Sequence, residues 1–169
     1  AHIAASDAIV NYPESFAEPF NMVRTGLNLH GAFNEASSAE LKLKPVMTLK
    51  SRIVQVRLMP PLSTVGYAQT WTAHSPTKIA LVACGYADGL PLALSNRGKV
   101  IVKGGFCPIV GRISMDYTAV DVTGVKAVKA GDEVILIGST SKASIGPEGW
   151  ANLKGTHVYD IICSLGERV

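Results

Sequence analysis

The stretch KSRIVQVRLM, residues 50–59, alternates apolar and polar side chains. Its apolar side chains share one face of an extended chain: Val54, Val56 and Leu58. The intervening Gln55 and Arg57 take the opposite face, since side chains alternate along a strand. This period of two predicts a half-buried β-strand, and the pair Pro60-Pro61 predicts its end.

Further apolar runs rich in β-branched residues follow: KIALVAC, KVIVKGG, CPIVGR, SMDYTAVDVT and DEVILIGS. Gly, Pro, Asn and Asp separate them at spacings of about ten residues, which is typical of a compact all-β unit. We expect a small barrel or sandwich over residues 43–139. A short helix should close the chain, with Thr156 as its N-cap, because apolar side chains follow at helical spacing: Val158, Ile161, Ile162 and Leu165.

The beginning of the chain has a different character. HIAAS (residues 2–6) and FNMVRTGLNLHG (residues 20–31) are expected to be extended, with a loop containing Pro13 and Pro19 between them. Two short strands cannot form a core alone. This region is therefore not expected to fold as an independent domain.

Composition limits the possible functions. The 169 residues are 47% hydrophobic and 17% charged, with a formal net charge of +3. A charged share below the usual one of about 25% suggests surface buried against a partner. The mild charge argues against nucleic-acid binding. No apolar run is long enough to span a bilayer and no signal peptide is visible, so we expect a cytoplasmic location without membrane association.

The residues that usually carry chemistry are sparse. Cys84, Cys107 and Cys163 form no Cys-x-x-Cys pair and are interpreted as buried reduced thiols, so no metal site is expected. The sequence motifs of P-loop NTPases, dinucleotide-binding dehydrogenases, zinc proteases and serine hydrolases do not occur. The tripeptide Gly-Tyr-Ala occurs twice, around Tyr67 and Tyr86. A phenol can transfer protons if its surroundings lower its pKa from about 10, and local sequence alone does not decide between these two tyrosines.

The order and spacing of several motifs resemble those of the alanine racemases: MVRTGLNLHG, TVGYAQTWTA, GYADGLP, PIVGRISMDYTAVDVT and HVYDIICSLGERV. The resemblance covers nearly the whole chain. In that family a pyridoxal-phosphate-binding barrel precedes a β domain. The resemblance implies a mostly β fold, with a small barrel-like or sandwich-like C-terminal domain and a short terminal helix, preceded by the tail end of a TIM-type (β/α)8 barrel. Residues 1–34 would be the barrel remnant and residues 35–169 the C-terminal β domain.

The resemblance also implies roles at the substrate. Tyr67 matches the family's catalytic tyrosine, the acid and base that acts on one face of the substrate Cα while the pyridoxal lysine acts on the other. Met115 matches a residue whose backbone helps to bind the substrate carboxylate. Tyr86 matches a tyrosine that supports the same pocket and is not the base.

Further positions match contacts to the cofactor, pyridoxal 5'-phosphate. Arg24 matches the arginine that faces the pyridine nitrogen, where a fixed cation opposes ring protonation. Ser6 and the backbone N–H groups of Gly26 and Leu27 match phosphate-binding positions. Tyr159 matches the tyrosine that hydrogen-bonds the same phosphate.

The resemblance further implies partners. The family's active site combines Arg24 of one subunit with Tyr67 and Met115 of the other, so we expect a homodimer. The family's Schiff-base lysine lies in a Lys-x-x-x-Tyr-Gly context that does not occur in this chain. The chain is therefore expected to act with an N-terminal barrel portion, as the C-terminal part of a larger enzyme.

Three positions depart from the family pattern. Ala5 replaces a usual Asn, His30 a common Tyr, and Leu92 a usual Arg. The favoured reading is an alanine racemase (an isomerase) that supplies D-alanine for bacterial peptidoglycan in the cell wall. A serine or broad-specificity racemase of the same family is one alternative, and a non-catalytic β module for dimerisation is another.

Overall fold

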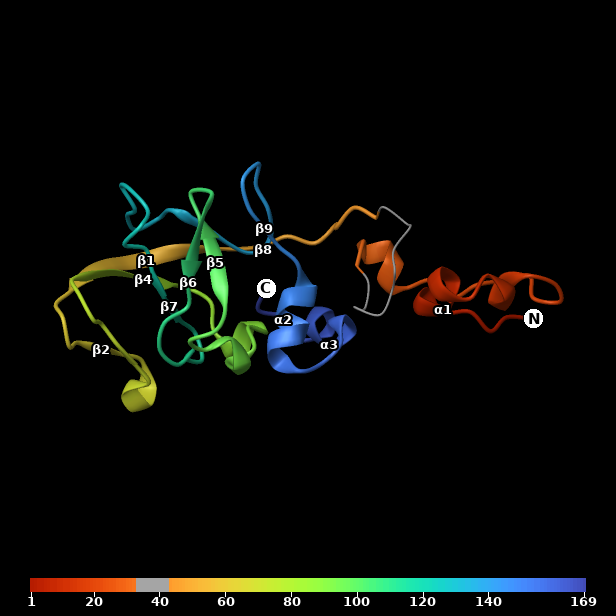
Figure 1. Ribbon diagram of the computed structural model, residues 1–169, viewed down its shortest axis with the longest axis horizontal. Helices are drawn as coiled ribbons and strands as arrows, with labels where there is room; N and C mark the ends of the chain where they lie inside the picture. Colours follow the sequence, from red (N-terminus) through yellow and green to blue (C-terminus); the bar gives the residue numbers. More distant parts are fainter. Residues whose placement is uncertain (33–42) are drawn as a thin grey trace.

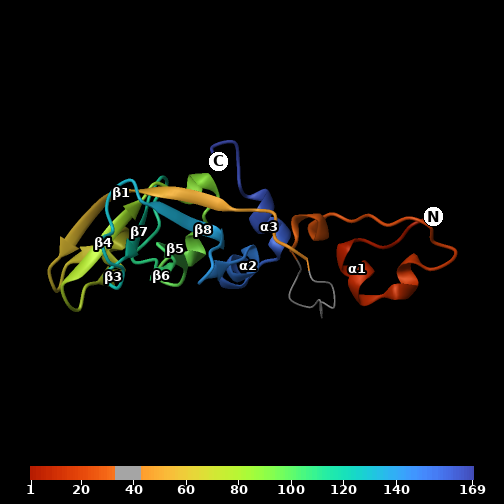
Figure 2. The same cartoon turned by 90° about the horizontal axis from the view of Figure 1, so that it is seen from above.

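The computed structural model describes residues 1–32 and 43–169. An N-terminal segment extends from one end of the molecule, a curved sheet forms the other end, and two short helices lie between them (Figure 1). Figure 2, turned by 90°, shows the same extension of the N-terminal segment away from the sheet. The boundary expected between residues 34 and 35 lies outside the described residues.

The sheet has the strand order β6-β5-β8-β1-β4-β7, with β9 added beside β8. Its strands are β1 (Leu49–Met59), β4 (Thr77–Val82), β5 (Lys99–Val102), β6 (Gly105–Pro108), β7 (Thr118–Asp121), β8 (Glu133–Ser139) and β9 (Ser144–Ile145). All of these pairs are antiparallel. The two end strands meet through a bridge between Ile109 and Val120, and the Val110 N–H donates to the Ala119 carbonyl over 2.9 Å. The sheet is thus a nearly closed barrel, as predicted.

The strand β8 lies at the centre of the core. Residues 134–137 are all buried, so both faces of this strand are covered. A continuous run of Val, Ile and Leu is what a strand buried on both faces requires. The same hydrophobic core contains Ile53 of β1, Ile101 of β5 and Trp150 of the helix α2 (Pro147–Lys154).

The prediction for the faces of β1 was right for Val56, which is half-buried and packs against the core, and wrong for Val54 and Leu58. Val54 and Leu58 are 44% and 69% exposed, whereas Ile53 is buried. Ile53 pairs with Val82 of β4 and Gln55 with Leu81, so Val54 is the extra residue of a β-bulge, which shifts the alternation by one position. In addition, β8 pairs with residues 49–52, whereas the later half of β1 pairs with β4 and is less covered.

Two short helices follow the sheet. The helix α2 was not predicted; Pro147 stands in its first turn, where a missing N–H costs no helical bond. The helix α3 (Val158–Cys163) was predicted, but its N-cap is His157 and not Thr156. The strands β2 (Thr64–Val65) and β3 (Trp71–Thr72) form a separate two-stranded sheet, a hairpin. Several loops contain 3₁₀ turns: η3 (Tyr67–Gln69), η4 (Tyr86–Asp88) and η5 (Leu92–Leu94).

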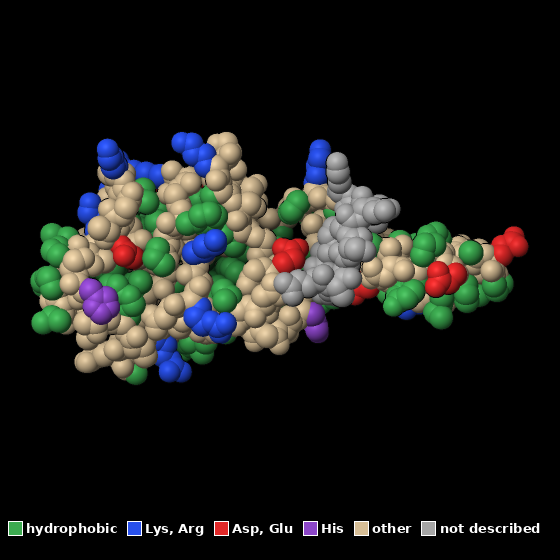
Figure 3. Space-filling view, in the orientation of Figure 1, with side chains coloured by type: hydrophobic (Ala, Val, Ile, Leu, Met, Phe, Trp, Pro, Cys, Tyr) green, Lys and Arg blue, Asp and Glu red, His purple; other side chains and the backbone are tan. Residues whose placement is uncertain are grey.

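The N-terminal segment contains short helices between two extended stretches that meet at a single bridge. The helix α1 (Ser6–Asn11) and the 3₁₀ turn η1 (Pro13–Phe16) occupy the region expected to be a loop, and the turn η2 (Leu27–His30) follows. Extended residues pair in parallel through the bridge between Ala5 and Arg24, which requires a crossover between them. Large apolar side chains of this segment are exposed: Ile3, Tyr12, Phe16, Met22, Val23 and Leu29. Figure 3 shows such side chains along the segment, and exposed apolar surface of this kind fits contact with a further unit.

The cysteines differ from one another. Cys84 and Cys107 are buried, as predicted, and burial raises the pKa of these thiols to about 12 and about 11. Cys163, at the end of α3, is exposed, so the prediction of a buried thiol was wrong there. An apolar position facing outward cannot be told from a core position by residue type alone.

Neither a membrane span nor a metal cluster is found in the part of the chain that the structure describes. No helix there is both long and apolar enough to cross a bilayer. No group of three His, Cys, Asp or Glu side chains there is placed to hold a metal ion.

The burial contrast within the sheet gives a stability prediction. Leu136→Ala should lower the free energy of unfolding by about 3 kcal/mol, because it leaves a cavity in the core, whereas Leu58→Ala should change it by less than about 1 kcal/mol. Leu136 is fully buried and Leu58 is 69% exposed. Urea denaturation of both variants measures the difference, and equal losses at the two positions would contradict the burial assignment.

Candidate functional site

The predicted phosphate-binding residues converge on one point. The Gly26 N–H donates to Ser6 Oγ over 3.0 Å, and the Leu27 N–H donates to the Tyr159 hydroxyl over 2.9 Å. The Tyr159 hydroxyl lies 3.4 Å from Ser6 Oγ, to which it donates. Ser6 is buried at the start of α1, and Tyr159 arrives from α3, 132 residues after Leu27. Residues from the two ends of the chain therefore form one cluster of donors.

This cluster has the chemistry of an oxyanion site. Two neighbouring backbone N–H groups and two hydroxyls can all donate to phosphate oxygens. A Cβ on Gly26 would lie 3.3 Å from the Tyr159 hydroxyl, so glycine allows the close approach at this point. The residues present thus fit the phosphate of the expected cofactor.

Arg24 lies two residues before this cluster in the extended segment. Its backbone N–H donates to the Ala4 carbonyl over 2.9 Å, which fixes the segment beside Ala5. Its guanidinium Nη1 contacts His2 Nδ1 at 2.6 Å, and because arginine only donates, the histidine nitrogen accepts. The side chain is exposed and able to face a bound ring.

Tyr86 and Met115 lie on two turns that are bonded to each other. The Tyr86 N–H donates to the Ser114 carbonyl and the Ala87 N–H to the Met115 carbonyl, each over 3.0 Å. A Cβ on Gly85 would lie 2.3 Å from the Met115 oxygen. The first glycine of GYADG is therefore required for this contact, and both side chains, Tyr86 and Met115, remain exposed.

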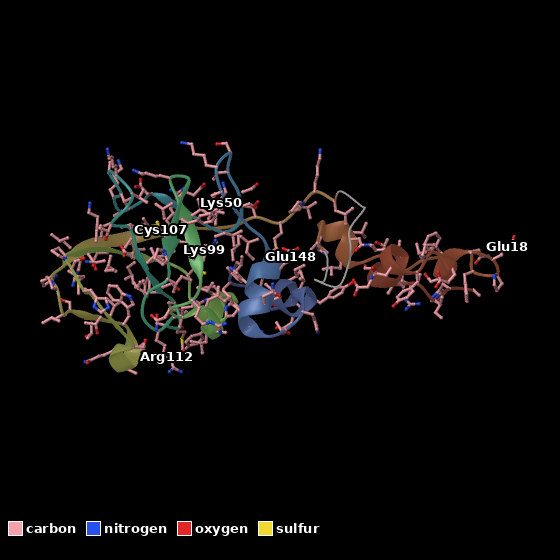
Figure 4. The ribbon with its side chains drawn as sticks, viewed as in Figure 1. Glu18, Lys50, Lys99, Cys107, Arg112 and Glu148 are labelled. Atoms are coloured by element: carbon pink, nitrogen blue, oxygen red, sulfur yellow. The ribbon has the colours of Figure 1, made fainter. Side chains whose placement is uncertain are left out.

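Tyr67 lies at the tip of the hairpin, in η3, and is 71% exposed. It borders a cavity of about 330 Å³ with an apolar wall of Val65, Leu81 and Ala119. The polar members of the lining are Tyr67, Arg112, Ser114 and Tyr117. The structure thus brings Tyr67 to the turn that contains Met115, and Figure 4 labels Arg112 near the hairpin tip.

Arg24 and Tyr67 are not brought together. The hairpin stands at one end of the elongated molecule and the N-terminal segment at the other, in both views (Figures 1 and 2). The predicted site residues therefore form two sets. The residues expected at the cofactor are called the cofactor group below: Ser6, Arg24, Gly26, Leu27 and Tyr159. Those expected at the substrate are called the substrate group: Tyr67, Tyr86 and Met115.

Sequence reasoning missed two arginines. Arg112 borders the Tyr67 cavity and also a second cavity of about 340 Å³ that Leu92 and Asn96 line. Arg168 contacts Asp88 and Asp116, and its hydrogen bond to Asp116, together with the charge of Asp88, raises its pKa. Both arginines lie inside the quoted motifs PIVGRISMD and CSLGERV, which was the available signal.

Two glycines hold the hairpin on the barrel. Gly66 and Gly111 have φ values of +79° and +73°, which only glycine adopts readily. A Cβ on Gly111 would lie 2.4 Å from the Val65 carbonyl oxygen, and one on Gly66 would lie 2.7 Å from the Arg112 nitrogen. The position of Tyr67 therefore depends on direct contact between two backbones.

Comparison with known proteins identifies the family of this chain. The family model described as alanine racemase, C-terminal domain, matches residues 46–169. The chain belongs to this family. Among curated relatives, an alanine racemase of Desulfosudis oleivorans is 41% identical and alanine racemase 1 of Clostridium acetobutylicum is 36% identical. Each match covers 99% of this chain and 43% of the relative, so the chain spans less than half the length of these racemases.

Solved alanine racemases share the fold. The enzyme from a D-cycloserine-producing Streptomyces lavendulae superposes with a TM-score of 0.91 at 37% identity, covering 99% of this chain and 44% of that one. The enzyme of Bartonella henselae, solved with covalently bound pyridoxal phosphate, superposes with a TM-score of 0.87 at 33% identity. This match covers 98% of this chain and 44% of that one. The barrel-like β fold expected from the resemblance is thus confirmed.

The glycine contact beneath the hairpin can be tested. Gly111→Ala should lower the free energy of unfolding by about 2 kcal/mol and loosen the hairpin, because alanine is strained at this φ and meets the Val65 carbonyl. Chymotrypsin should then cleave at Tyr67 or Trp71 faster than in the unmodified protein. Gly124→Ala, where a Cβ would meet nothing within 4 Å, is the matched control. Equal cleavage of both variants would show that this contact does not hold the hairpin.

Proposed function

We propose that this chain is the C-terminal part of a pyridoxal-phosphate-dependent alanine racemase, which interconverts L-alanine and D-alanine in the cytoplasm for peptidoglycan synthesis. In this proposal residues 1–34 belong to the cofactor-binding barrel and residues 35–169 to the β domain. The observation that carries it is the cluster of Ser6, Gly26, Leu27 and Tyr159, which joins the two ends of the chain around an oxyanion site. The names of the relatives support it.

The cofactor would be held at two points. Its phosphate would accept hydrogen bonds from the backbone of Gly26 and Leu27 and from the hydroxyls of Ser6 and Tyr159. Arg24 would face the pyridine nitrogen and, as a fixed cation, disfavour a second positive charge there. When bound, pyridoxal phosphate withdraws electrons from the substrate Cα and makes its proton more acidic.

Tyr67 would hold or remove the proton on one face of the substrate Cα. Racemisation requires that a proton leave one face and return on the other, so two opposed groups are needed. The second group, a lysine, would come from the barrel portion. Met115 would offer its backbone to the substrate carboxylate, and Tyr86 would support the same turn.

The separation of the two groups of residues supports a site shared between subunits. The N-terminal segment, which contains Arg24, and the β2–β3 hairpin, which contains Tyr67, lie at opposite ends of the molecule. We therefore propose a homodimer in which Arg24 and Tyr159 of one subunit meet Tyr67 and Met115 of the other. The 71% exposure of Tyr67 and the low charged fraction of 17% are consistent with surface that is covered on assembly.

The role of Tyr67 has a direct test. Tyr67→Phe in the complete enzyme should lower the rate of Cα proton abstraction from one alanine enantiomer by about a thousandfold, because the phenolic proton acceptor is lost. Cofactor absorbance should be unchanged. Exchange of the Cα proton with deuterated solvent, measured separately for each enantiomer, gives the rates.

Tyr12→Phe serves as the control, since it removes the hydroxyl of another exposed tyrosine, one that does not line the cavity. Unchanged exchange for both enantiomers of the Tyr67 variant would refute the assignment. The same assay on L-serine separates an alanine racemase from a serine or broad-specificity racemase. A non-catalytic β module would show neither exchange nor a cofactor band.

Tyr159 tests the cofactor group independently. Tyr159→Phe should weaken pyridoxal phosphate binding about tenfold, because one hydrogen bond to a charged phosphate is lost. Titration of the cofactor-free enzyme, followed by absorbance, measures the affinity, and kcat at saturating cofactor should change little. An unchanged affinity would place the phosphate elsewhere.

A further inference from the structure

Arg168 joins the two turns that carry Tyr86 and Met115. Its Nε lies 3.2 Å from Asp88 Oδ1, and its Nη2 lies 2.7 Å from Asp116 Oδ1. The other carboxylate oxygen of Asp88, Oδ2, accepts the Gly85 N–H over 2.8 Å. One guanidinium therefore links a carboxylate on each turn.

Each of these carboxylates is adjacent to the substrate group. Asp88 ends η4, which begins with Tyr86, and Asp116 follows Met115 directly. The planar guanidinium fork donates in fixed directions and can hold two carboxylates at once. A lysine ammonium, as a single point, lacks this geometry.

The segment that carries Arg168 is itself packed on the GYADG turn. Ser164 Oγ donates to the Gly89 carbonyl over 3.3 Å. A Cβ on Gly89 would lie 2.6 Å from the backbone carbonyl oxygen of Ser164. Gly89 has a φ of +90°, so the close contact and the backbone conformation both require glycine. The chain after α3 is thereby aligned to bring Arg168 to the two aspartates.

We propose that Arg168 is a positioning residue for substrate binding. It holds the Met115 turn against the GYADG turn, so that the Met115 backbone is fixed where the substrate carboxylate is received. This inference rests on the proposed function, in which Met115 contacts that carboxylate. Arg168 itself contacts neither substrate nor cofactor in this proposal.

The experiment uses the complete, cofactor-loaded enzyme. Arg168→Gln should raise KM for L-alanine and for D-alanine about threefold to tenfold, the effect of losing a partly exposed charged contact, with kcat within about twofold. The ratio kcat/KM should fall by the same factor for both enantiomers, because the equilibrium constant of one between them ties the two kcat/KM values together. Propionate, which is alanine without its amino group, should lose inhibitory affinity by the same factor. Cofactor absorbance and Tm should stay unchanged.

Two variants complete the test. Lys50→Gln removes a cation that is as exposed as Arg168 from an ion pair of 3.1 Å with Glu133 on the strand β8, and should leave KM unchanged. Arg168→Lys keeps the charge without the fork and should raise KM to an intermediate value. The KM of Arg168→Lys also tests the positioning role if Arg168→Gln does not fold.

Several results would overturn the positioning role. One is a KM of Arg168→Gln that equals the wild-type value. Another is a parallel decrease in kcat, cofactor absorbance and Tm. A third is a wild-type KM in Arg168→Lys, which would assign the effect to charge alone. A wild-type enzyme that does not racemise alanine would instead contradict the proposed function, and the two failures are therefore distinguishable.

Discussion

The near-closure of the sheet between β6 and β7 is the constraint on which the substrate group depends. The bridge between Ile109 and Val120 and the bond from Val110 to Ala119 bring together the two ends of the connecting loop. The buried Thr118 hydroxyl donates to the Cys84 carbonyl over 2.7 Å and ties this loop to the end of β4. Without that closure, the residues between these strands would have no fixed surface on which other segments could dock.

Three segments dock on this loop, two of them through backbone contacts and the third through a side-chain ion pair. The hairpin with Tyr67 rests on Gly111, the GYADG turn bonds to Ser114 and Met115, and Arg168 reaches Asp116 from the end of the chain. The backbone contacts leave no room for a Cβ, which explains why glycines stand at these points of the motifs. The glycines therefore determine where the functional side chains lie, although they carry no chemistry themselves.

Sequence patterns predicted the secondary-structure elements better than they predicted which side chains of an element are buried. The runs KIALVAC and DEVILIGS became β4 and β8 because period and composition agree along each of them. Val54 was assigned to the wrong face of β1 because the bulge there is set by pairing with β4, which a single strand does not reveal. The helix α2 was missed since its sequence, PEGWANLK, opens with Pro and contains Gly, residues that usually mark loops.

The residues of the candidate site were likewise only partly predictable from local sequence. Tyr67 and Tyr86 have the same Gly-Tyr-Ala context, so only the resemblance to alanine racemases ranked them, and the cavity beside Tyr67 is a property of the docked hairpin. A quoted motif contained Arg168, but its contact could not be inferred because its partner Asp116 is 52 residues away. Its role depends on three segments meeting in space.

The separation of the two groups has a consequence for assembly. In the proposed function a barrel would complete the cofactor group and cover the exposed apolar side chains of residues 1–32. The substrate group contains Tyr67, which is 71% exposed. In the proposed dimer each chain completes a different half of two sites, because α3 carries Tyr159 toward one site while the segment after it, with Arg168, braces the turns of the other. The geometry for proton transfer would then form only on subunit association, and a change at the dimer contact would alter both sites at once.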